Sequence, residues 1–177
     1  MTNYIALAMR TNSTVTGLSA LSPDLLHATL GLCDEHFEYH MAQSWLNAGE
    51  ELGDFCWFIA LAAHSLKCDP FADAERFLAR HPEAPLLAEA LHEFVTLVKK
   101  TYAYGAELPV ERLQTLLAAM AGRIAAICFG KLDRSFDELL AANIAKLQAR
   151  FPERFEAALA LTRDLKQEAS ALRSELH

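Results

Sequence analysis

The sequence has few of the residues that form β-strands or interrupt helices. Val and Ile together supply only nine of the 177 residues, and there are seven Gly and six Pro. Ala and Leu supply 31 and 29 residues. β-Branched side chains favour strands, whereas Ala and Leu have high helix propensities. The composition therefore predicts an all-α protein, and the length suits one domain with a sizeable core.

Positive charge is also scarce. Sixteen Lys and Arg stand against 23 Asp and Glu, which gives a net charge of −7. Such a surface repels a phosphate backbone, so we expect no nucleic acid partner. The four cysteines lie far apart without a C-x-x-C pair, as in a reducing cytoplasm. No basic region precedes the short apolar run near the N-terminus, and the longest apolar stretch, residues 55–66, is too short to span a bilayer. We therefore expect a cytoplasmic protein outside the membrane.

Helix start and stop signals divide the chain. Ser22 with Pro23 is a helix start, Ser135 with Glu138 forms a capping box, and Gly130 is an expected C-cap. Short connections predict a helical bundle of about six to seven helices, in a single domain of residues 22–177 after an N-terminal strap of residues 1–21. The expected helices cover about residues 22–41, 44–66, 69–80, 86–104, 109–129 and 135–150, with a last charged helix from residue 152.

The fourth and fifth expected helices also align with the first two when Met120 is placed on Trp57. One interpretation is a decayed repeat that has lost its acids and builds a four-helix bundle within one chain. The alternative is that two unrelated amphipathic hairpins align passably.

Four acids of the first two long helices fall on inward faces. Glu35 and Glu38 are three residues apart, and so are Glu51 and Asp54. A spacing of three places both members of a pair on one helix face, and the second pair continues the otherwise apolar stripe of Trp57. Carboxylates turned into a bundle repel one another and lose hydration, so they need a cation. Oxygen ligands without a cysteine pair favour Mg²⁺, with Mn²⁺ as an alternative, over zinc.

For any single Glu, the competing interpretation is an ordinary solvated helix acid. We favour the metal because two pairs with the same spacing on adjacent helices are not typical of a solvated face. His36 and His40 are four residues apart, but the H-E-x-x-H order is absent and no third soft ligand is near. We therefore expect no zinc site.

Three segments resemble the all-α nucleoside triphosphate pyrophosphohydrolases of the MazG-like superfamily. Residues 30–38 (LGLCDEHFE) look like the first acidic helix of that family, and residues 50–60 (EELGDFCWFIA) look like its second, with the motif E-E-L-G-D-x-x-W-Y. Residues 142–152 (ANIAKLQARFP) look like the N-x-x-K-L-x-x-R-Y-P segment of the phage and bacterial branch. Residues 67–135 intervene where shorter members of the family have almost no chain, and the resemblance is thinner there.

The resemblance implies hydrolysis of a (deoxy)nucleoside triphosphate to the monophosphate and pyrophosphate. It also implies Mg²⁺ held by Glu35, Glu38, Glu51 and Asp54, because divalent ions neutralise the triphosphate and the charge that develops in the transition state. Glu50 or Glu35 is the candidate general base.

Six further residues are candidate substrate contacts. Asn143 and Lys146 share an inward face of their helix. We assign Asn143 to sugar, base or phosphate and Lys146 to phosphate. Arg150 lies one turn further along the same helix. Lys99 and Lys100 lie in a segment that resembles a K-K-x-x-Y-G element of longer relatives. Trp57 is placed to stack on a base, one turn beyond the acids, and Trp45 is a weaker candidate for the same role. The competing interpretations are a snorkelling lysine, a basic helix end and a core aromatic. The six are Asn143, Lys146, Arg150, Lys99, Lys100 and Trp57.

Alternatives within the enzyme class are a dUTPase- or dCTPase-like enzyme and a phosphoribosyl-ATP pyrophosphohydrolase, because base selectivity depends on a few pocket side chains. From another class, the alternative is a catalytically inert helical adaptor that retains the fold. An adaptor gains nothing from inward like charges, which argues against it. Apolar helix faces in this class favour a homodimer or homotetramer.

Overall fold

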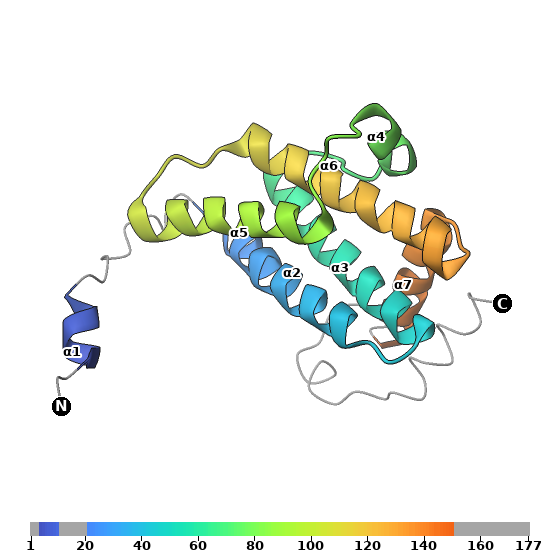
Figure 1. Cartoon of the computed structure of the whole chain (residues 1–177), viewed down its shortest axis with the longest axis horizontal. Helices are drawn as coiled ribbons and strands as arrows, with labels where there is room; N and C mark the ends of the chain where they lie inside the picture. The colour runs from blue at the N-terminus through green and yellow to red at the C-terminus, as the bar shows by residue number, and fades with distance from the viewer. Residues whose placement is uncertain (1–3, 11–20, 151–177) are drawn as a thin grey trace.

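Six α-helices and one π-helical turn follow one another along residues 21–150, and one short helix lies within residues 4–10; these two ranges are the part of the chain that the computed structural model describes (Figure 1). The described residues contain no strand, which confirms the all-α bundle predicted from the composition. The elements are α1 (Tyr4–Met9), α2 (Pro23–Met41), α3 (Trp45–Leu66), α4 (Ala74–Arg80), α5 (Leu87–Tyr104), α6 (Val110–Ile127), the π-helical turn η2 (Cys128–Leu132) and α7 (Phe136–Arg150).

Side-chain caps fix the starts of three helices. The Ser22 hydroxyl accepts a hydrogen bond of 3.0 Å from the backbone N–H of Leu25 at the start of α2. The Ser44 hydroxyl accepts a hydrogen bond of 3.1 Å from the backbone N–H of Asn47 at the start of α3. At α7, the Glu138 carboxylate accepts from the backbone N–H of Ser135, and the Ser135 hydroxyl accepts from the N–H of Glu138. These caps satisfy N–H groups that have no partner within the helix, so the predicted starts are confirmed.

Three expected boundaries differ from the structure. The third helix begins at Ala74 because the Asp69 carboxylate first accepts from the Phe71 N–H in a turn. Gly130 is not a C-cap: α6 runs into the π-helical turn, and Asp133 takes the left-handed conformation that ends it, with φ 53°. The N-terminal strap contains helix α1. The expected helix after residue 152 lies outside the described residues.

The core consists of two helical hairpins that pack face to face (Figure 1). α2 and α3 form one antiparallel pair, α5 and α6 form the other, and α5 contacts α2 while α6 contacts α3. α4 covers α6, and α7 packs against α3. The two hairpins thus build a four-helix core within one chain. Its largest fully buried apolar side chains include Phe55, Ile59, Phe94, Leu117 and Met120.

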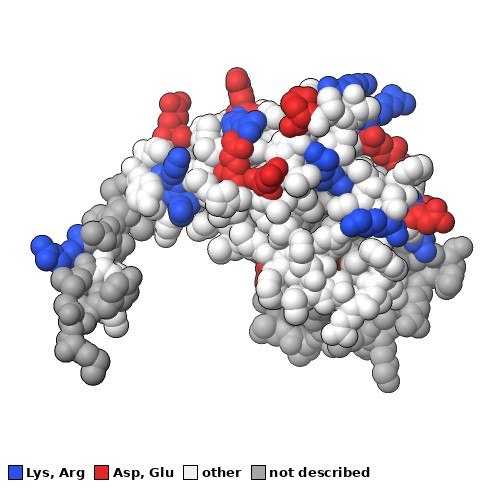
Figure 2. All heavy atoms as spheres, in the orientation of Figure 1, with Lys and Arg blue, Asp and Glu red and all other residues white. Residues whose placement is uncertain are grey.

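Charges of both signs alternate on the surface formed by α4, α5 and α6 in Figure 2, without a continuous basic area on that face. By length and composition, Val110–Leu132 is apolar enough to cross a membrane, but more than half of its most apolar window is buried inside the bundle. The central helix of a water-soluble bundle has the same properties.

Gly31 allows α2 and α3 to approach closely, because a Cβ atom there would lie 2.2 Å from the Phe58 ring. We expect Gly31→Ala to lower the free energy of unfolding by about 1–3 kcal/mol, the cost of overpacking a core. Gly49→Ala is the matched control on a helix, because its Cβ would lie 3.8 Å from Leu132, an ordinary contact. Urea unfolding of both variants measures the effect. Equal stability of Gly31→Ala and the parent would contradict the close packing.

Candidate functional site

Three of the four predicted metal ligands meet in space. Glu35 and Glu38 lie on α2, Glu51 lies on α3, and one carboxylate oxygen from each lies within 4.8 Å of the other two. We call these three residues the acid triad. Glu35 and Glu51 are half-buried and Glu38 is exposed, so the triad sits at the rim between the two helices. The Oε2 atom of Glu35 is buried and has no hydrogen-bond partner among the described residues.

The environment of the triad disfavours negative charge. Burial, and then the charge of Asp54, raise the pKa of Glu35 to about 8, with further contributions from Glu38 and Glu51. Burial, and then the charge of Glu38, raise the pKa of Glu51 to about 7, although a hydrogen bond from the Asn47 amide lowers it in part. Carboxyl groups that hold protons at such pH values are groups that a cation would stabilise.

These raised pKa values predict how stability depends on pH in a chelator. The folded chain binds more protons than the unfolded chain between about pH 4.5 and about pH 8, so these two acids make stability fall as the pH rises through that window. We expect the melting temperature to drop between about pH 4.5 and about pH 8, and to drop less in Glu35→Gln. Thermal unfolding followed by circular dichroism measures both. The same drop in parent and variant would show that Glu35 ionises normally.

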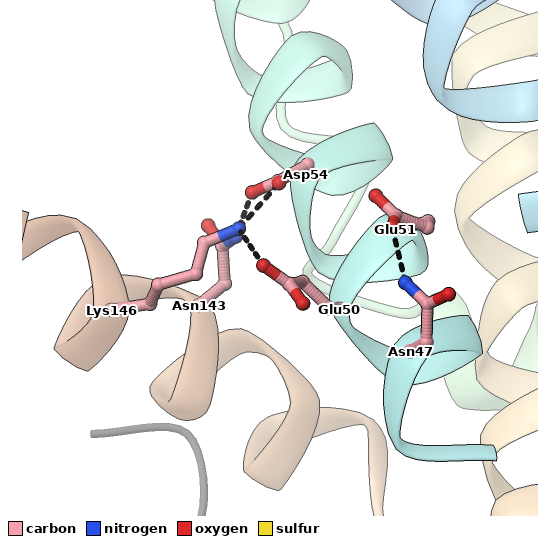
Figure 3. A network of polar contacts seen from close by, with 6 residues as sticks. All are labelled: Asn47, Glu50, Glu51, Asp54, Asn143 and Lys146. Atoms are coloured by element: carbon pink, nitrogen blue, oxygen red, sulfur yellow. Dashed lines mark hydrogen bonds and ion pairs between the residues drawn. The ribbon is translucent and has the colours of Figure 1, made fainter. Parts of the chain in front are cut away.

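Asp54, the fourth predicted ligand, is held by α7 rather than grouped with the triad (Figure 3). The Asn143 amide donates a hydrogen bond of 2.7 Å to its Oδ1 atom, and the Lys146 ammonium makes an ion pair with its Oδ2 atom. Lys146 also lies 3.4 Å from the Glu50 carboxylate. Only 2% of the Lys146 side chain is exposed, so this cation is buried between two carboxylates. The charges of this network still act on the triad, because Asp54 raises the pKa of Glu35 and Lys146 lowers it.

Gly53 makes this contact between α3 and α7 possible. A Cβ atom at position 53 would lie 3.1 Å from the Asn143 side chain, which is closer than most Cβ contacts. The absence of a side chain at Gly53 therefore lets α7 come near enough for Asn143 and Lys146 to reach Asp54. The glycine of the E-E-L-G-D motif thus has a packing role in this chain.

Glu50 and Glu51 are neighbours in sequence but point to different helices. Glu51 faces α2 and the triad, whereas Glu50 faces α7 and Lys146 (Figure 3). Successive residues of a helix are rotated by about 100°, which explains the separation. Of the two candidate general bases, Glu35 therefore lies within the acid triad, and Glu50 lies across α3 from it.

The other candidate contacts lie in different places. Arg150 is half-buried at the end of α7, one turn beyond Lys146. Trp57 is 38% exposed and its ring contacts the rings of His27 and Phe58. The structure does not bring Lys99 and Lys100 to the acids, because they are exposed near the C-terminal end of α5, at the opposite end of the bundle from the turn between α2 and α3 (Figure 1).

Two features of the site were not predicted from the sequence. Asn47 binds Glu51, and its spacing of four residues on one helix was an available signal. A partly open pocket between α3 and α7 was not accessible to sequence reasoning, because it forms only where distant segments meet. The chain matches no protein-family model, no curated protein and no solved structure.

Proposed function

We propose that this protein hydrolyses a (deoxy)nucleoside triphosphate to the monophosphate and pyrophosphate, with Mg²⁺ bound by the acid triad. The observation that carries the proposal is the convergence of Glu35, Glu38 and Glu51 from two helices at the rim of the bundle. A second support is the resemblance of residues 30–60 and 142–152 to MazG-like enzymes.

The residues present fit a divalent cation. The Glu35 Oε2 atom is buried without a hydrogen-bond partner in the described part of the chain, and the pKa values of Glu35 and Glu51 are raised by their burial and by neighbouring acids. The donors are all carboxylate oxygens, the ligand type that Mg²⁺ prefers. When bound, the ion supplies positive charge that stabilises the triphosphate and the transition state.

The chain's own residues then have separate roles in this proposal. Glu35 accepts a proton from the attacking water, because it combines a raised pKa with a place inside the triad. Lys146 binds a phosphate oxygen, as the resemblance to MazG-like enzymes implies; in the structure its ammonium group pairs with Glu50 and Asp54. Asn143 orients Asp54 by donating a hydrogen bond to it, and it remains the candidate contact for sugar, base or phosphate.

The test is an end-point screen of common and modified nucleoside triphosphates with and without Mg²⁺, in which pyrophosphate and orthophosphate are resolved. We expect pyrophosphate from at least one triphosphate, and only with the metal. Orthophosphate alone would indicate a different bond cleavage. No turnover, together with no Mn²⁺ binding by electron paramagnetic resonance, would instead favour the inert helical adaptor.

A further inference from the structure

A partly open pocket of about 170 Å³ lies on the α7 side of α3, apart from the acid triad on the α2 side. Its lining comes from α3, from the η2 turn and the connection that follows it, and from α7. Apolar groups and two glycines form most of the wall. Three side chains of different polar character also reach it: a carboxylate, a guanidinium group and an amide. The residues that matter for its chemistry are Trp45, Gly49, Glu50, Arg134, Leu139 and Asn143.

The aromatic member of this lining is unusually exposed. Trp45 is 61% exposed at the first residue of α3, although an indole ring has a large apolar surface to bury. Gly49, one turn further along α3, leaves space beside it, because among the described residues only Leu132 is recorded within 4 Å of where its Cβ would be. A flat apolar-faced ligand that stacks on Trp45 would use this space. The polar groups would bind the hydrogen-bonding edge of such a ligand.

Two residues connect this pocket with the acids. Glu50 lines the pocket and lies 3.4 Å from the Lys146 ammonium, which also pairs with Asp54. Asn143 lines the pocket and donates to Asp54. The pocket therefore shares Glu50 and Asn143 with the network around Asp54, the fourth predicted metal ligand.

We propose that the pocket between α3 and α7 binds a nucleobase stacked on Trp45, and that it thereby selects the nucleotide that the site accepts. The role in substrate selection rests on the proposed function, whereas binding of the base itself does not. Base stacking on an aromatic side chain contributes about 1–3 kcal/mol, which corresponds to about five- to 150-fold in affinity. Such a contribution is large enough to determine substrate preference.

The two tryptophans of the chain make the location testable. Trp57→Phe leaves Trp45 as the fluorescent reporter, and Trp45→Phe leaves Trp57. Each variant is titrated with adenosine, guanosine, cytidine, uridine and thymidine in a chelator, and quenching of indole fluorescence is recorded. We expect saturable quenching by at least one nucleoside in Trp57→Phe and none in Trp45→Phe. Quenching through Trp57 alone, or no quenching by any nucleoside, would overturn the proposal.

A second variant tests the space rather than the ring. Gly49→Leu, made in the Trp57→Phe background, adds a side chain that fills the pocket from a helical position where a Cβ atom makes only an ordinary contact. We expect at least a tenfold loss of nucleoside affinity, with an unchanged circular dichroism spectrum and unchanged Mn²⁺ binding at the triad. Gly49→Ala is the control and retains binding. Unchanged affinity in Gly49→Leu would place the base outside this pocket.

These readouts separate the two proposals. Nucleoside binding needs neither metal nor turnover, so quenching through Trp45 without any triphosphate hydrolysis would retain the pocket and reject the proposed reaction. Hydrolysis without quenching through Trp45 would retain the proposed reaction and reject the pocket as the base-binding site.

Discussion

Glu51→Gln is expected to lower turnover of the accepted triphosphate by a factor on the order of 10³ and to leave the helical circular dichroism spectrum unchanged. The substitution removes one of three converging carboxylates. A metal ion stabilises the charge of the transition state by several kcal/mol, and each 1.36 kcal/mol corresponds to about tenfold in rate. The neutral amide has a similar shape, so the fold should tolerate it.

The same variant should unfold at a higher temperature than the parent in a chelator at about pH 8.5. The reason is that the charge of Glu51 contributes to the repulsion that raises the pKa of Glu35, and the amide removes it. Asp34→Asn is the matched control, because Asp34 is an exposed acid on α2 next to the triad. We expect its activity to stay near that of the parent. Full activity in Glu51→Gln would reject the metal assignment.

Lys146→Met is expected to lower the free energy of unfolding by about 3 kcal/mol. Removing one partner of a buried ion pair costs about 3–5 kcal/mol, because the remaining charge is left without compensation. We take the lower end since about a fifth of each carboxylate side chain, Asp54 and Glu50, is exposed to water. Met keeps the apolar length of the side chain, so the packing of α7 on α3 changes little.

Neutralising the partner should recover part of this loss. We expect the double variant Lys146→Met with Asp54→Asn to be more stable than Lys146→Met alone, because one uncompensated charge is gone. Lys131→Met, at an exposed position, is the control and should change stability by less than about 0.5 kcal/mol. Urea unfolding in a chelator measures all three. If Lys146→Met lowered the free energy of unfolding no more than Lys131→Met does, Lys146 would be well hydrated rather than buried.

Taken together, the two substitutions separate two parts of the site. In the proposed function the triad binds the metal, and its mutual repulsion lowers stability in a chelator, whereas the network around Lys146 stabilises the packing of α7 on α3. Glu51→Gln should therefore lose activity and gain stability without metal, and Lys146→Met should lose both. The opposite signs of the stability change distinguish an acid that binds the metal from a lysine that also holds α7 on α3.

Local chemistry determined much of the fold before any contact was known. The caps at Ser22 and Ser135 satisfy N–H groups within three residues of themselves, so their sequence neighbours were sufficient to predict them. Gly130 misled the prediction because a helix end depends on which residue reaches the left-handed conformation, and tertiary packing let α6 continue into a π-helical turn.

By itself, the sequence determined that Glu35 and Glu38 share one face of their helix, because residues three apart on a helix are neighbours. The same spacing did not keep Glu51 and Asp54 together, since Glu51 joins the triad and Asp54 is held by α7. Only the tertiary structure decided that Glu50 faces Lys146, that Asn143 and Lys146 hold Asp54, and that a pocket opens beside Trp45. The physical reason is that a periodic pattern defines the face of a helix, whereas the packing of α7 on α3 defines what that face meets.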